Sequence, residues 1–121
     1  MSRLDLFIDR MVAQRACLDW AAKAIEPLAG PAFELGLGNG RTYDHMREKL
    51  PGRDIYVFDR HVASHPSSTP ADEFLYLGEL PETIVKARER FEGQVALRHA
   101  ALGPHSEKKT IKYLRQLSPA Y

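Results

Sequence analysis

The stretch Ala32 to Thr42 reads A-F-E-L-G-L-G-N-G-R-T and decides the fold of this chain. A short apolar run leads into three glycines at alternate positions, and Arg41 to Leu50 then carries apolar residues at helical spacing. This order predicts a strand, a tight turn and a helix. Glycines at alternate positions let the backbone turn with positive φ and let a ligand approach where a Cβ would collide. The stretch therefore predicts a ligand-binding turn at the carboxyl end of a strand.

A second strand is predicted from Asp54 to Asp59, D-I-Y-V-F-D, because β-branched and aromatic residues favour β-structure. In a parallel α/β sheet, a carboxylate at the carboxyl end of the second strand lies beside the crevice above the first. There it can accept hydrogen bonds from both hydroxyls of a ribose. Asp59 thus predicts a nucleoside ligand, but it does not decide which nucleoside cofactor binds.

Composition limits the class of protein. The chain has 121 residues, of which 44% are hydrophobic and 27% charged, which is typical of one globular domain. A formal net charge of +1 gives no reason to expect nucleic acid or an anionic membrane as a partner. The single cysteine, Cys17, excludes an intramolecular disulfide and offers no metal-ligand cluster, so we expect no metal and a cytoplasmic protein. Charges spread through the first ten residues argue against a signal peptide or a membrane span.

The rest of the chain alternates predicted helices and strands. An amphipathic helix is predicted from Leu4 to about Ile25, with Cys17 and Trp20 as packing residues on it. Prolines and serines predict a long loop, Arg60 to Asp72, after the second strand. The elements predicted after this loop are, in chain order, a strand Glu73 to Leu77, a helix Pro81 to Phe91, a strand Gln94 to Ala101 and a helix from Ser106 to Leu117.

The glycine stretch resembles motif I of the class I S-adenosylmethionine-dependent methyltransferases, commonly written as an acid, an apolar residue and G-x-G-x-G. Glu34 supplies the acid, and Gly36, Gly38 and Gly40 supply the glycines. The dinucleotide fingerprint G-x-G-x-x-G would instead place its third glycine where this chain has Arg41. The resemblance implies an α/β, Rossmann-like fold with a parallel sheet of strand order 3-2-1-4. It also implies S-adenosyl-L-methionine as the cofactor.

The resemblance further implies which residues border the cofactor. In that family the glycine turn passes along the methionine and ribose portions, and the acid ending the second strand holds the ribose. A glycine followed by an acid commonly ends the third strand beside the adenine, and Gly78-Glu79 fits that pattern. The predicted cofactor-binding residues are Glu34, Gly36, Leu37, Gly38, Asn39, Gly40, Arg41, Thr42, Asp59, Arg60, Gly78, Glu79 and Leu80.

The fourth strand carries the candidate catalytic residue. In the family this strand usually ends with an acidic or polar residue that faces the transferred methyl group or the substrate. This chain has His99, Ala100 and Ala101 there, so the acid is absent and His99 is the candidate base, since imidazole titrates near neutral pH. A sulfonium is a good leaving group, so catalysis can rest on positioning the donor and the acceptor in line.

The complete family fold has seven strands, whereas this chain ends after the helix that follows the fourth. We therefore expect a truncated class I methyltransferase fold, either a fragment or a short form. We expect residues 1–121 to form one domain, with a helical cover over 1–30 and an α/β core over 31–121. The alternative to a fragment or short form is that a partner subunit, such as a second copy, covers the open edge of the fourth strand. The predicted function is methyl transfer to a small-molecule acceptor, with no nucleic acid or membrane involved.

Two other function classes remain open. A non-catalytic module that binds S-adenosylmethionine or another nucleoside, or that serves in interactions, would fit Ala101 and the missing strands. An NAD(P)-binding oxidoreductase domain would fit Asp59, but it needs the later third glycine that Arg41 replaces.

Overall fold

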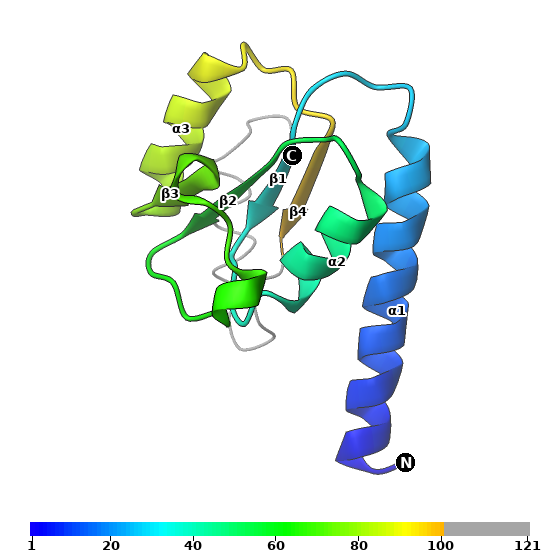
Figure 1. Cartoon of the computed structure of the whole chain (residues 1–121). Helices are drawn as coiled ribbons and strands as arrows, with labels where there is room; N and C mark the ends of the chain where they lie inside the picture. Colours follow the sequence, from blue (N-terminus) through cyan, green and yellow to red (C-terminus); the bar gives the residue numbers. More distant parts are fainter. Residues whose placement is uncertain (101–121) are drawn as a thin grey trace.

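The computed structural model of this protein describes residues 1–100 and contains one four-stranded parallel sheet (Figure 1). The strand order is β3-β2-β1-β4, which confirms the predicted order and fold class. The predicted helix from Ser106 to Leu117 lies outside the described residues. The elements are α1 (Arg3–Ala24), β1 (Ala32–Leu35), α2 (Arg41–Lys49), β2 (Ile55–Asp59), the 3-10 turns η1 (Pro66–Ser68) and η2 (Asp72–Phe74), β3 (Leu75–Leu77), α3 (Leu80–Arg90) and β4 (Leu97–Ala100).

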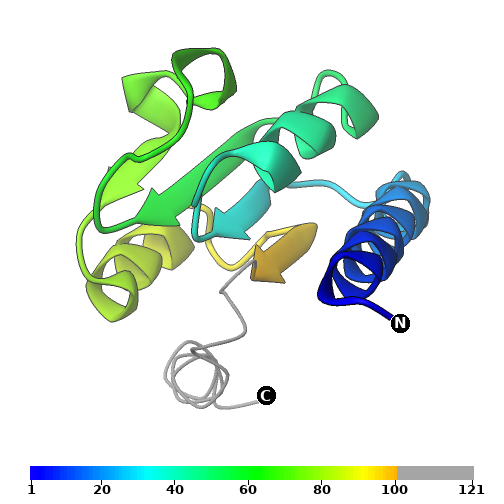
Figure 2. The same ribbon diagram turned by 90° about the horizontal axis from the view of Figure 1, so that it is seen from below.

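The sheet is covered on both faces, as a parallel sheet requires. Figure 2 shows α2 on one face and α3 on the other, with α1 beside α2. Along β1 the side chains alternate between the two sides. Ala32 packs with residues of α1 and α2, whereas Phe33 and Leu35 pack with residues of α3. All four residues of β1 are buried, which makes β1 the centre of the core.

Only the second half of α1 contributes buried side chains to the core. Leu18, Ala22 and Ile25 are buried in the cluster with β1 and α2, whereas Leu4 is 65% exposed. The first half of α1 extends past the sheet, and the N-terminus lies at the end of α1 that is farthest from the sheet (Figure 1). The prediction that Trp20 packs in the core is wrong, because its side chain is 73% exposed.

Cys17 is exposed as well, so its prediction as a packing residue is also wrong. The prediction assigned too wide a buried face to α1, because Cys17 and Trp20 are neighbours of the buried Leu18 and Ala22 in sequence but lie on a side of the helix that faces solvent. Within residues 1–100, no helix combines the length and the apolar character that crossing a membrane requires.

Three strands begin later than predicted, β2 by one residue, at Ile55, and β3 and β4 by two or more. Glu73 and Phe74 form part of η2, so β3 begins at Leu75. Strand β4 begins at Leu97, because Gln94 and Val95 still belong to the turn that follows α3. Between β2 and β3 the chain forms only two 3-10 turns, as the proline and serine content of this loop predicted.

Candidate functional site

The glycine turn connects β1 to α2 at the carboxyl end of the sheet. Gly38 and Gly40 have φ values of 54° and 86°, in the left-handed region that favours glycine. A Cβ on Gly38 would meet nothing within 4 Å, so the backbone is open to a ligand there. A Cβ on Gly40 would lie 2.6 Å from the Ser68 carbonyl oxygen. The turn is thus open at Gly38, whereas Gly40 provides room for the loop that carries η1.

The carboxylate of Asp59 lies within this turn. Its Oδ2 accepts hydrogen bonds from the backbone N–H groups of Leu37 at 2.9 Å and Gly38 at 3.4 Å. Its Oδ1 accepts a hydrogen bond from the N–H of Arg60 at 2.7 Å. The end of β2 and the turn after β1 are therefore joined through one carboxylate. Each carboxylate oxygen can accept more than one hydrogen bond, so Asp59 retains capacity for a ligand hydroxyl.

The residues predicted to border the adenine lie at the adjacent strand ends. Arg60, after β2, forms an ion pair with Glu79, with Nε and Oε1 3.3 Å apart, and both side chains are more than half exposed. The N–H of Gly78 donates to the carbonyl oxygen of Asp59 at 3.0 Å. Leu80 is the first residue of α3. The ends of β2 and β3 thus bring these residues to the same edge of the sheet as the glycine turn.

The remaining turn residues differ in what they present. The Leu37 side chain is buried in the core, so only its backbone faces the turn. Asn39 accepts a hydrogen bond from the N–H of Arg41 through Oδ1 at 3.1 Å, which fixes the start of α2. Arg41 and Thr42 form the first turn of α2, and the Arg41 guanidinium lies over the ring of Phe7, with 5.7 Å between Cζ and the ring centroid.

Glu34 and His99 form a buried pair across β1 and β4. The two residues are directly opposite in the parallel register, and Nδ1 of His99 lies 2.8 Å from Oε1 of Glu34. Glu34 is 0% exposed, and its Oε2 has no hydrogen-bond partner. Because side chains alternate along a strand, Glu34 points to the same face as Ala32, toward α1 and α2. Its carboxylate therefore lies inside the core and has no exposed surface.

Sequence reasoning named both residues but missed this contact. The strand order 3-2-1-4 makes β1 and β4 neighbours, and each residue is the third of its strand. Aligning the predicted strands at their carboxyl ends, Leu35 with Ala101, would have placed Glu34 opposite Ala100, one residue away from the observed partner.

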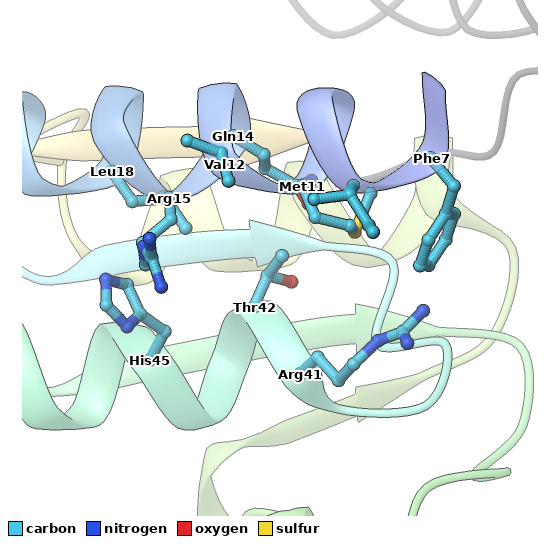
Figure 3. A pocket seen from close by; sticks show the side chains of 10 residues that line it. Phe7, Met11, Val12, Gln14, Arg15, Leu18, Arg41, Thr42 and His45 are labelled. Atoms are coloured by element: carbon cyan, nitrogen blue, oxygen red, sulfur yellow. The ribbon is translucent and has the colours of Figure 1, made fainter. Parts of the chain in front are cut away.

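Sequence reasoning also missed a cavity between α1 and α2, of about 320 Å³ (Figure 3). It opens beside the glycine turn, since Arg41 and Thr42 form part of its wall. His45 lies at the same wall, and its Nε2 is 2.7 Å from Oδ1 of Asp19 on α1. This hydrogen bond lowers the pKa of the Asp19 carboxyl below its ordinary value. No group of three or more His, Cys, Asp or Glu side chains within residues 1–100 is arranged to hold a metal ion.

The glycine turn and Asp59 fit an adenosyl ligand. The turn offers backbone without a Cβ at Gly38, which lets a ligand lie against it. The Asp59 carboxylate is fixed next to that opening and can accept hydrogen bonds from ribose hydroxyls. The ends of β2 and β3 then extend the same surface with polar side chains, Arg60 and Glu79. The crevice above the carboxyl ends of parallel strands is the usual binding position for nucleosides in such sheets.

Comparisons with known proteins agree with this geometry. Residues 1–121 match a protein family described as S-adenosyl-L-methionine methyltransferase. The chain is also similar to the crystal structure of an S-adenosyl-L-methionine methyl transferase from Silicibacter pomeroyi DSS-3, with 55% sequence identity and a TM-score of 0.87. This similarity covers 98% of the present chain and 73% of that chain. No curated protein matches the chain.

Proposed function

Because the chain belongs to the S-adenosyl-L-methionine methyltransferase family, we propose that it transfers a methyl group to a small-molecule acceptor. The predicted family and cofactor are confirmed, so the protein is an S-adenosyl-L-methionine-dependent methyltransferase. The acceptor class is the proposed part. Its support is the cavity of about 320 Å³ beside the glycine turn, a size that suits a small ligand rather than a macromolecular surface.

The observation that carries the proposed cofactor site is the Asp59 carboxylate held against the open backbone at Gly38. In this site the backbone from Gly36 to Gly40 lies along the cofactor, and Asp59 accepts hydrogen bonds from the ribose. Arg60 and Glu79, joined at 3.3 Å, border the adenine. Glu34 is fully buried, so we assign it a supporting role in the core next to the strand end rather than a contact with the cofactor.

When bound, S-adenosylmethionine supplies an electrophilic methyl group on a sulfonium that leaves as a neutral thioether. The protein then has mainly to orient the acceptor and keep water away, which can lower the barrier substantially without a base. His99 does not line the cavity between α1 and α2, so it is the proposed proton acceptor only where the reacting atom of the acceptor extends from the cavity to β4 and carries a proton. Its Nδ1 is held by Glu34 at 2.8 Å, so Nε2 is the nitrogen that can take the proton.

The proposal extends to the organisation of the chain. Residues 1–121 form one S-adenosylmethionine-binding domain, with residues 1–30 beside an α/β core over residues 31–121. Within the described residues β4 pairs only with β1, so its second edge is available to a further strand or to a second copy. The exposed, unpaired Cys17 is consistent with the reducing environment of the cytoplasm, where we place the protein.

The cofactor site is tested by thermal unfolding with S-adenosylhomocysteine and, separately, with NAD. S-adenosylhomocysteine is expected to raise the melting temperature, because a ligand at 100 times its Kd stabilises the folded state by about 2.7 kcal/mol. NAD is expected to leave it unchanged. A shift with NAD and none with S-adenosylhomocysteine would contradict the proposed site.

The acceptor class is tested by labelling. A cell extract incubated with the protein and methyl-labelled S-adenosylmethionine is separated into low-mass, protein and nucleic-acid fractions, and Asp59→Ala serves as the inactive control. We expect Asp59-dependent label in the low-mass fraction. Label confined to protein or nucleic acid would overturn the small-molecule acceptor.

A further inference from the structure

The cavity between α1 and α2 shares only Arg41 and Thr42 with the proposed cofactor site. Its other lining residues have no role in that site. Figure 3 shows side chains of α1 and α2 lining this space. Its volume of about 320 Å³ lies at the lower end of the range for small-ligand pockets. The lining residues are Phe7, Ile8, Met11, Val12, Gln14, Arg15 and Leu18 from α1 and Arg41, Thr42 and His45 from α2.

The walls of the cavity combine apolar surface with positive charge. Phe7, Ile8 and Val12 are 37%, 49% and 49% exposed, so a ligand bound here would remove apolar surface from water. Arg15 and Arg41 add two guanidinium groups to the lining, and no Asp or Glu belongs to it. These groups favour a ligand whose apolar body carries a negative charge.

The only other titratable group of the lining is already engaged. His45 is bound to Asp19 at 2.7 Å, and Asp19 itself does not line the cavity. Asp19 also interacts with the charge of Arg15, but within the lining itself Arg15 and Arg41 are the permanently charged groups, and both are positive.

We propose that this cavity binds the methyl acceptor, and that the acceptor is a small molecule with an apolar body and one anionic group. The inference rests on the proposed function, because it takes the acceptor to be a small molecule. The cavity shares α2's first turn with the glycine turn, so a ligand in it lies next to the cofactor site. The apolar groups hold the body of the acceptor, and Arg15 and Arg41 hold its anionic group.

A second copy of the chain is a poorer occupant. In a symmetric dimer the same patch meets itself, so the arginines of one copy would face those of the other. Like charges brought together at an interface oppose association. The exposed apolar residues Leu6 and Trp20 lie outside the cavity lining, so contacts through them would leave the cavity open.

The experiment compares three probes with the same chain length: octanoate, octan-1-ol and octylammonium. Binding to the protein saturated with S-adenosylhomocysteine is measured by calorimetry. Octanoate is expected to bind at least about tenfold more tightly than octan-1-ol, because a hydrogen bond to a charged group contributes about that factor in affinity. Octylammonium is expected to bind most weakly of the three. Equal binding of octanoate and octan-1-ol would overturn the inference.

Two matched pairs of variants locate the probe. Val12→Glu places a carboxylate in the cavity and is expected to weaken octanoate binding about tenfold or more. Val85→Glu, on α3, is the control, because Val85 is 48% exposed and Val12 is 49% exposed. Arg15→Gln is expected to weaken octanoate but not octan-1-ol, and Lys23→Gln near the end of α1 is expected to change neither. Equal effects of Val12→Glu and Val85→Glu would overturn the inference.

The remaining outcomes separate this inference from the proposed function. A protein that binds S-adenosylhomocysteine but shows no preference for octanoate overturns the acceptor cavity alone. A protein that fails to bind S-adenosylhomocysteine overturns the proposed cofactor site, and with it the acceptor role of the cavity. Expulsion of octanoate by S-adenosylhomocysteine overturns the inference, since the cavity would then be part of the cofactor's own site. Light scattering could also show that Val12→Glu separates a dimer while octanoate binding is unchanged. That result would assign the cavity surface to contact with a second copy and would overturn the inference as well.

Discussion

Asp59 has two physical roles that a substitution has to separate. Its carboxylate accepts hydrogen bonds from the N–H groups of Leu37 and Gly38, so it helps to fix the shape of the turn. In the proposed site the same carboxylate also accepts hydrogen bonds from the ribose. Loss of Asp59 is therefore expected to lower both the stability of the turn and the affinity for the cofactor.

Asp59→Ala is expected to weaken the binding of S-adenosylhomocysteine by about 1–3 kcal/mol, through the loss of charged hydrogen bonds. Calorimetry gives the affinity, and urea unfolding at the same temperature shows that the variant remains folded. Asp72→Ala removes an exposed acid from η2, outside the turn, and is the matched control. An affinity that is the same for Asp59→Ala and Asp72→Ala would contradict the proposed role of Asp59.

The buried pair of Glu34 and His99 predicts a strongly non-additive set of variants. His99→Leu leaves the fully buried Glu34 carboxylate without its partner, and we expect the free energy of unfolding to fall by about 3–5 kcal/mol. The double variant Glu34→Leu/His99→Leu replaces both polar groups by apolar ones, which is expected to recover much of that loss. Urea unfolding of the two singles and the double gives the coupling. A double variant that loses the sum of the two single effects would show that the contact contributes nothing.

At the scale of elements, α1 and α2 are held together by apolar packing and by one polar contact. Leu18 and Met46 belong to the same buried cluster. The bond between Asp19 and His45, at 2.7 Å, adds a polar link between the two helices. The walls of the proposed acceptor cavity therefore depend on how firmly α1 stays against α2.

This contact predicts a dependence of stability on pH. The hydrogen bond to His45 lowers the folded-state pKa of Asp19 from its ordinary value of 3.8. The contribution of Asp19 to stability is therefore fully present above pH 3.8 and is lost as the pH falls through the lower folded-state pKa. Melting temperatures measured from neutral pH into acid should fall less steeply below pH 3.8 for Asp19→Asn than for the wild type.

The capping-box acid Asp5 serves as the control for Asp19. Its pKa is also lowered, by hydrogen bonds from Ser2, but it lies in the exposed first turn of α1. Because the first turn of α1 contacts little of the body and can open without unfolding the sheet, Asp5→Asn is expected to change the dependence of the melting temperature on acid pH less than Asp19→Asn does. If the melting temperature falls equally steeply with acid pH for Asp19→Asn and for the wild type, the contact between α1 and α2 does not depend on the Asp19 carboxylate.

At the scale of the whole molecule, the sequence predicted features set by local pattern and strand order. The glycines after β1 and the acid ending β2 were found because a strand, a turn and a helix each have a short-range signature. The contact between Glu34 and His99 was missed because it depends on register between strands far apart in the chain. The exposure of Trp20 was missed because a helical pattern does not reveal how wide the buried face of the helix is. The packing of Ser68 against Gly40 was missed because loop positions have no periodic signal.

The uneven packing of the molecule predicts an uneven pattern of hydrogen exchange. Backbone amides of β1 and β2 lie at the centre of the core, so they are expected to exchange only through global unfolding. Amides in the first two turns of α1 are expected to exchange much faster, because the residues around Leu4 to Ile8 are exposed and contact little of the body.

Octanoate, added to the protein saturated with S-adenosylhomocysteine, should slow exchange around Phe7 to Val12, since these residues would then have a packing partner. Octan-1-ol at the same concentration should slow it less. Mass spectrometry of peptic fragments resolves the two halves of α1. Without any ligand, the amides in the first half of α1 could instead be as strongly protected from exchange as those of β1, and lose this protection when the protein is diluted. That result would mean that a second copy covers the first half of α1. The proposed acceptor cavity would then be closed in the assembled protein.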